Sequence, residues 1–75
     1  MSSSASGAVA VTLALNAIMR DDRGRLLSAL ISRVRDFQLA EDSLQESLEA
    51  ALIHWGRSGL PREPRAWLLR VARRR

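Results

Sequence analysis

The sequence contains no cysteine, lysine or tyrosine, and it has only two prolines and one histidine. Without cysteine the chain has no disulfide and no thiolate metal ligand, which fits a reducing compartment. No segment approaches the roughly eighteen uncharged apolar residues that a membrane-spanning helix requires. Neither a glycine-rich phosphate loop nor a metal-ligand spacing occurs, so the sequence predicts no enzyme activity, no cofactor and no metal site.

Charged side chains are missing from the first nineteen residues, and the apolar stretch at residues 8–19 has some features of a secretory signal. A signal needs basic residues before its apolar region, whereas the first arginine here, Arg20, follows it. We therefore expect a cytoplasmic protein without membrane interaction, with a flexible tail at residues 1–7 and one helical domain at residues 8–75. Such a short chain buries only about 60% of its unfolded surface, so close helix packing or a partner must stabilise it.

The charges of the remaining residues are separated along the chain. Residues 20–35 carry five arginines and two aspartates, residues 36–55 carry five acids and no arginine, and residues 56–75 carry seven arginines and one glutamate. The net charge of +4 therefore combines an acidic segment with basic segments on both sides. The excess of arginine favours a polyanionic partner, while the acidic segment favours a basic one.

The acidic segment predicts an amphipathic helix. One face repeats apolar residues at helical spacing: Leu44, Leu48, Ala51, Leu52 and Trp55. Asp36 is the expected N-cap, because its carboxylate can accept a hydrogen bond from a first-turn N–H. Gly56 and Gly59 are expected to end the helix after Trp55.

The opposite face of this helix carries acceptor side chains at the same spacing. We call them the acidic stripe: Asp42, Gln45, Glu46 and Glu49. A solvated helix face usually mixes both charge signs, and this one has a single sign. The stripe is therefore suited to docking against a basic partner helix, because charge complementarity sets register and association rate.

The flanking segments are also helical in pattern. Residues 8–35 predict one long helix or two, with Gly24 as the place for a kink. Pro61 and Pro64 predict a loop and the first turn of a further helix. The buried face expected for that helix consists of Trp67, Leu68, Val71 and Ala72. No strand pattern occurs, so the predicted fold class is all-α, a small three- to four-helix bundle.

The aromatic residues favour structural roles, whereas the C-terminal arginines leave two roles open. Trp55 and Trp67 lie on apolar faces and are expected in the core. His54 is expected at the surface near a helix C-terminus, where a charged ring interacts favourably with the dipole. Seven arginines lie near Trp67 and a Gly/Pro loop. They are suited either to keeping the C-terminal segment soluble or to binding a nucleic acid, with arginines on its phosphates and stacking on its bases.

Two motifs lie in these helices. Residues 36–52 read DFQLAEDSLQESLEAAL, with Ala40-Glu41-Asp42 before Gln45-Glu46, and residues 59–75 read GLPREPRAWLLRVARRR, with Ala66-Trp67-Leu68 before an arginine-rich run. They resemble the A-E-D-x-x-Q-E and W-L-x-x-x-A-R motifs in region two of bacterial RNA polymerase sigma factors of the extracytoplasmic-function type. The resemblance covers about residues 18–75, with both motifs in the family's order and spacing.

The resemblance implies a sigma-factor fragment that acts in transcription initiation. In the family, the first motif binds the clamp coiled coil of the largest RNA polymerase subunit. The following loop and the second motif contact the promoter minus-ten element and its melted non-template strand. Carried over to this chain, the clamp-binding residues are Asp42, Gln45, Glu46 and Glu49, with Glu41 at the margin. The DNA-binding residues are Arg57, Arg62, Arg65, Arg70, Arg73 and Arg74.

Some features depart from the family pattern or leave other readings open. Leu48 stands where an aromatic residue is common, and related factors continue beyond the position of Arg75, so we expect a domain truncated at its C-terminal end. An anti-sigma factor is a further partner to consider, and an apolar first helix favours self-association.

Two other function classes stay open. One is a standalone helical interaction module, such as a polymerase-binding decoy or adaptor that does not bind DNA. The other is a small arginine-rich DNA-binding protein unrelated to initiation. The acidic stripe argues against the latter, because it would repel phosphate along a whole helix.

Overall fold

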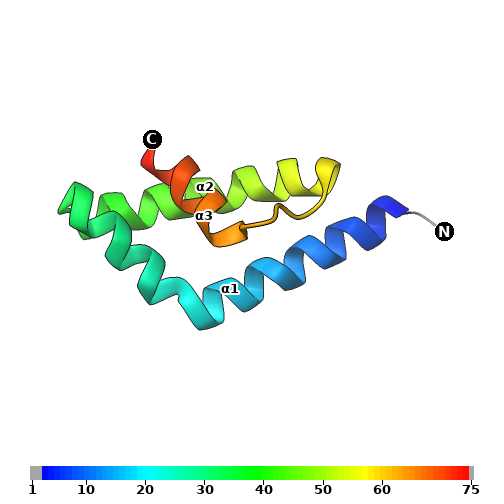
Figure 1. Ribbon diagram of the computed structural model, residues 1–75, viewed down its shortest axis with the longest axis horizontal. Coiled ribbons are helices and arrows are strands. Elements are labelled where there is room, and N and C mark those ends of the chain that lie inside the picture. Colours follow the sequence, from blue (N-terminus) through cyan, green and yellow to red (C-terminus); the bar gives the residue numbers. More distant parts are fainter. Residues whose placement is uncertain (1–2, 75) are drawn as a thin grey trace.

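The computed structural model describes the backbone of residues 3–74 and the side chains of residues 7–32 and 35–74. It contains three helices, α1 (Ser3–Val34), α2 (Phe37–Ser58) and α3 (Pro64–Arg73), and no strand within the described range. Each helix packs against the other two, with the short α3 crossing α2 (Figure 1). The predicted all-α class is therefore confirmed, with three helices. Among the described helices, none has the length and apolar character needed to cross a membrane.

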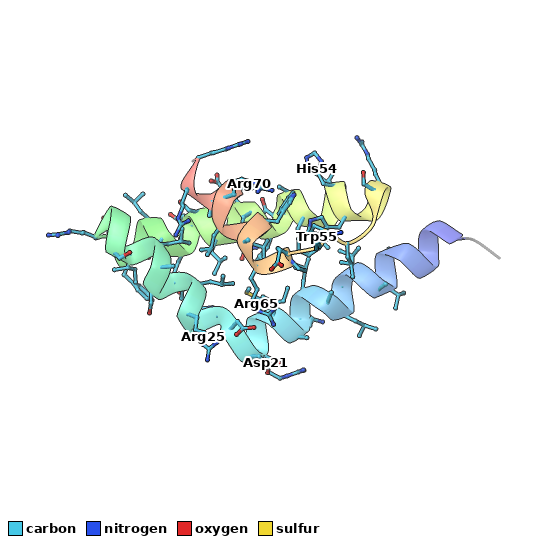
Figure 2. The ribbon with its side chains drawn as sticks, in the orientation of Figure 1. Asp21, Arg25, His54, Trp55, Arg65 and Arg70 are labelled. Carbon is cyan, nitrogen blue, oxygen red and sulfur yellow. The ribbon has the colours of Figure 1, made fainter. Side chains whose placement is uncertain are left out.

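Helix α1 is one continuous element, which settles the question that the sequence left open. It begins at Ser3, whereas the sequence places the start of the domain at residue 8; residues 1 and 2 of the expected tail lie outside the described residues. The helix changes direction in its cyan part, and Asp21 lies at this bend (Figures 1 and 2). The bend lies close to Gly24, whose missing side chain weakens a helix locally. The bend allows both halves of α1 to follow the core.

Local capping defines the ends of α2. The Asp36 side chain accepts a hydrogen bond from the Leu39 N–H at 3.1 Å, which confirms it as the N-cap. The expected end after Trp55 is wrong, because α2 continues through Gly56 to Ser58. A single glycine costs a helix only about 1 kcal/mol and does not break it. Gly59 ends the helix instead: it adopts a φ of 87°, and its N–H donates to the Trp55 carbonyl at 2.8 Å.

The buried face of α2 is rotated slightly from the predicted one. Its buried residues are Ala40, Leu44, Ser47, Ala51 and Trp55. The expectation that Leu52 is buried is wrong, because its side chain is 50% exposed. Ser47 takes part in the core instead, since its hydroxyl donates to the Leu44 carbonyl at 2.7 Å and so needs no water. Small residues along this face let the neighbouring helices approach closely.

Helix α3 closes the core, as its sequence pattern predicts. Pro64 occupies the first helical turn, where its missing N–H costs nothing. Leu68 and Ala72 are buried, and Trp67 and Val71 are half-buried on the same face. The Trp67 ring meets the buried Trp55 ring edge to face, with centroids 5.2 Å apart. The core thus fixes the two helices that carry the sequence motifs relative to each other.

Candidate functional site

The acidic stripe lies on the outer surface of α2. All four of its side chains are exposed, on the side of the helix opposite the buried Leu44 and Ala51. Asp42 also accepts a hydrogen bond from the Gln38 amide at 3.1 Å, one turn earlier. Because the opposite face is anchored in the core, the stripe is presented on a rigid element rather than on a loop. Its arrangement is suited to binding a basic surface along about two helical turns.

Glu41 lies beside the stripe and is oriented towards α1. Its carboxylate pairs with the Arg23 guanidinium at 2.5 Å, and its side chain is only 29% exposed. Arg23 therefore partly neutralises Glu41 within the domain itself. The other acidic side chains on the outer surface of α2 are Asp42, Glu46 and Glu49, and the role of Glu41 in partner binding stays a prediction.

Most of the predicted DNA-binding arginines are exposed around α3. Arg57 lies in the last turn of α2, Arg62 precedes α3, and three others lie in or just after α3: Arg70, Arg73 and Arg74. Arg57 shares α2 with the acidic stripe but lies at the C-terminal end of the helix, beyond Glu49, whereas the other four lie after α2. The last arginine, Arg75, lies outside the described residues.

Among the predicted DNA-binding arginines, Arg65 forms an ion pair within the fold. Its Nε donates to the Asp22 carboxylate of α1 in a short ion pair. Asp22 is only 8% exposed, and its other oxygen lies 4.0 Å from Arg25. Figure 2 shows Arg65 extending from the start of α3 towards the bend of α1, where Asp21 and Arg25 are labelled. This pair could not be predicted from the sequence, because 43 residues separate its partners.

We expect the Asp22–Arg65 pair to stabilise the fold by holding α3 on α1. Asp22→Ala and Arg65→Ala should each lower the free energy of unfolding by about 1–3 kcal/mol. The first variant removes the largely buried carboxylate, and the second leaves that carboxylate without the Arg65 guanidinium. The double variant should cost less than the sum of the two. Urea unfolding followed by circular dichroism measures all three values. Strictly additive losses would show that the two residues do not act together.

The end of α2 carries an aromatic cluster with Trp67 of α3. The exposed His54 ring lies 6.0 Å from the Trp67 ring, in keeping with the expected surface position of this histidine. Trp55 is buried, as expected, and its Nε1 has no hydrogen-bond partner among the described residues. Within that part of the chain, no cluster of His, Asp or Glu side chains is arranged to hold a metal ion.

Comparison with known proteins shows similarity to a protein family and to a bacterial relative. The Sigma-70 region 2 family matches residues 18–75, which include both motifs, α2, α3 and the second half of α1. An uncharacterized protein of Rhizobium meliloti (strain 1021) is 43% identical over 51 residues, or 68% of this chain. The chain spans only 12% of the length of that relative. No solved structure matches.

Proposed function

The chain belongs to the sigma-70 region 2 family, and from this membership we propose that it binds the clamp helices of RNA polymerase and helps to open the promoter minus-ten element. We place it with the extracytoplasmic-function type of sigma factor. It then acts in transcription initiation in the cytoplasm. There it binds its partners and catalyses no reaction itself. An anti-sigma partner and self-association stay predictions.

The uniformly acidic outer face of α2 is the observation that carries the polymerase-binding half of the proposal. Its exposed carboxylates at Asp42, Glu46 and Glu49 lie on one face, and no arginine or lysine occurs between residues 36 and 55. A basic coiled coil could lie along this face without meeting a like charge. Such complementarity speeds association and fixes the register of the complex.

The exposed arginines support the promoter-binding half. Arg57 lies just before the loop between α2 and α3, Arg62 lies within this loop, and Arg70 is exposed on α3. Contacts from arginine to phosphate supply affinity without sequence preference, whereas base contacts supply specificity. Because Arg65 already pairs with Asp22, the proposal assigns phosphate binding chiefly to the other arginines.

The polymerase-binding half is tested by calorimetric titration of the 75-residue protein with the isolated clamp coiled coil. We expect binding at low salt that weakens as salt rises, because complementary exposed charges are screened. Failure to bind at low salt would contradict the proposal. Binding that does not depend on salt would show that the charges of the acidic stripe do not drive the association.

For the promoter-binding half, we expect the protein to bind single-stranded minus-ten DNA weakly. Replacing Arg70, Arg73 and Arg74 together by alanine should reduce the slope of log affinity against log salt by about 2, since each lost single-strand phosphate contact contributes about 0.7. Fluorescence anisotropy of a labelled oligonucleotide measures the slope. The single variant Arg20→Ala, on α1, serves as the control and should leave it unchanged.

An unchanged slope in the triple variant would refute the phosphate role of α3. If the unmodified protein binds the clamp coiled coil but no DNA at low salt, the adaptor or decoy alternative is correct instead.

A further inference from the structure

A shallow groove lies between α1 and α2, beside the acidic stripe. It has a volume of about 290 Å³, and its lining includes Thr12, Asn16 and Met19 from α1 and Gln45, Leu48 and Leu52 from α2. None of the side chains that line it is charged. The groove is therefore an uncharged, largely apolar surface next to a strongly negative one.

Two residues connect the groove to the acidic stripe. Gln45 belongs to the stripe and also lines the groove. Leu52 lies one turn beyond Leu48 and stays 50% exposed, although its helix was expected to bury it. A partner that lies along the stripe therefore passes over the mouth of the groove and can cover Leu52.

We propose that this groove receives an apolar side chain from the same basic clamp helices that bind the acidic stripe. The inference rests on the proposed function and adds a second, apolar part to its interface. Protein interfaces obtain most of their affinity from a few apolar anchors in desolvated pockets, and surrounding charges act mainly on rate and orientation. The groove supplies such a pocket, and the stripe supplies the charges.

The inference also gives a role to the part of the chain that precedes the family match. Thr12 and Asn16 lie before residue 18, where that match begins, and yet they form one wall of the groove. The first half of α1 is held in place because Val11 and Leu15 are buried in the core. This extension therefore contributes to partner binding and not only to packing.

Two variants of the 75-residue protein test the groove, with the isolated clamp coiled coil as the probe. Leu52→Ser removes exposed apolar surface, and Asn16→Trp fills the groove. Each should weaken binding about tenfold, the loss expected for one partly buried leucine contact. Because neither variant changes a charge, the salt dependence should stay that of the unmodified protein. Leu13→Ser is the matched control: Leu13 is 63% exposed on α1, does not line the groove and should leave binding unchanged.

The possible results separate the groove from the acidic stripe. Binding of both groove variants with unmodified affinity would overturn the groove assignment, while loss of binding after charge reversal in the stripe would still support clamp docking. Absence of binding by the unmodified protein would overturn both. Sedimentation provides a further check: a dimer that Leu52→Ser dissociates would assign the groove to a second copy of the chain and overturn its assignment to the clamp. Unchanged helical circular dichroism shows that each variant is folded.

Discussion

Reversing the charge of Asp42 and Glu46 together, as Asp42→Arg with Glu46→Arg, is expected to abolish binding to the clamp coiled coil. The loss should be at least about a hundredfold in affinity, because like charges placed opposite each other at an interface cost several kcal/mol. Both residues are exposed on α2, so the reversal leaves the core intact. Calorimetric titration measures the loss, and circular dichroism should show unchanged helix content.

A second double variant with the same change in net charge serves as the control. Asp21→Arg with Glu63→Arg alters exposed acids on α1 and just before α3, away from the acidic stripe. We expect this protein to bind the clamp coiled coil within a few-fold of the unmodified one. Equal losses in the two double variants would indicate a non-specific effect of net charge, and unmodified affinity after stripe reversal would disprove the clamp assignment.

The largest expected effect on stability comes from Leu68→Ala in α3. Leu68 is 0% exposed, and the packing of its side chain in the core holds α3 against the other helices. Truncation of a buried leucine costs about 2–5 kcal/mol, which is a large part of the roughly 4–11 kcal/mol expected for a domain of this size. The melting temperature should therefore fall by at least about 10 °C. Thermal unfolding monitored by circular dichroism measures this fall.

The control for this prediction is Leu60→Ala, in the loop before α3. Leu60 is 49% exposed, so its truncation should change stability by less than about 0.5 kcal/mol. A similar fall in both variants would show that burial of Leu68 is not what fixes α3.

The features that could be predicted from the sequence depend on nearby residues. Asp36 caps α2 through an N–H three residues away, and Pro64 begins α3 because its ring already has a helical φ. The acidic stripe follows from helical spacing within a single element. Such features need only local geometry, so the exposure of the acidic stripe on α2 could be predicted.

The features that could not be predicted depend on how the helices pack. Leu52 and Ser47 lie on either side of the predicted buried face, and only the position of α1 and α3 decides which one is covered. The Asp22–Arg65 pair likewise joins two helices that the sequence does not place side by side. Gly56 was expected to end a helix, but a glycine does so only where the chain adopts a positive φ, as at Gly59.

The central claim, that the acidic stripe is the surface that meets RNA polymerase, is tested most directly by nuclear magnetic resonance. The isotope-labelled 75-residue protein is titrated with the unlabelled clamp coiled coil, and its amide shifts are followed. We predict the largest changes at Asp42, Gln45, Glu46 and Glu49, with small changes in α3. Changes confined to α3 and the preceding loop, with the stripe unaffected, would contradict the claim.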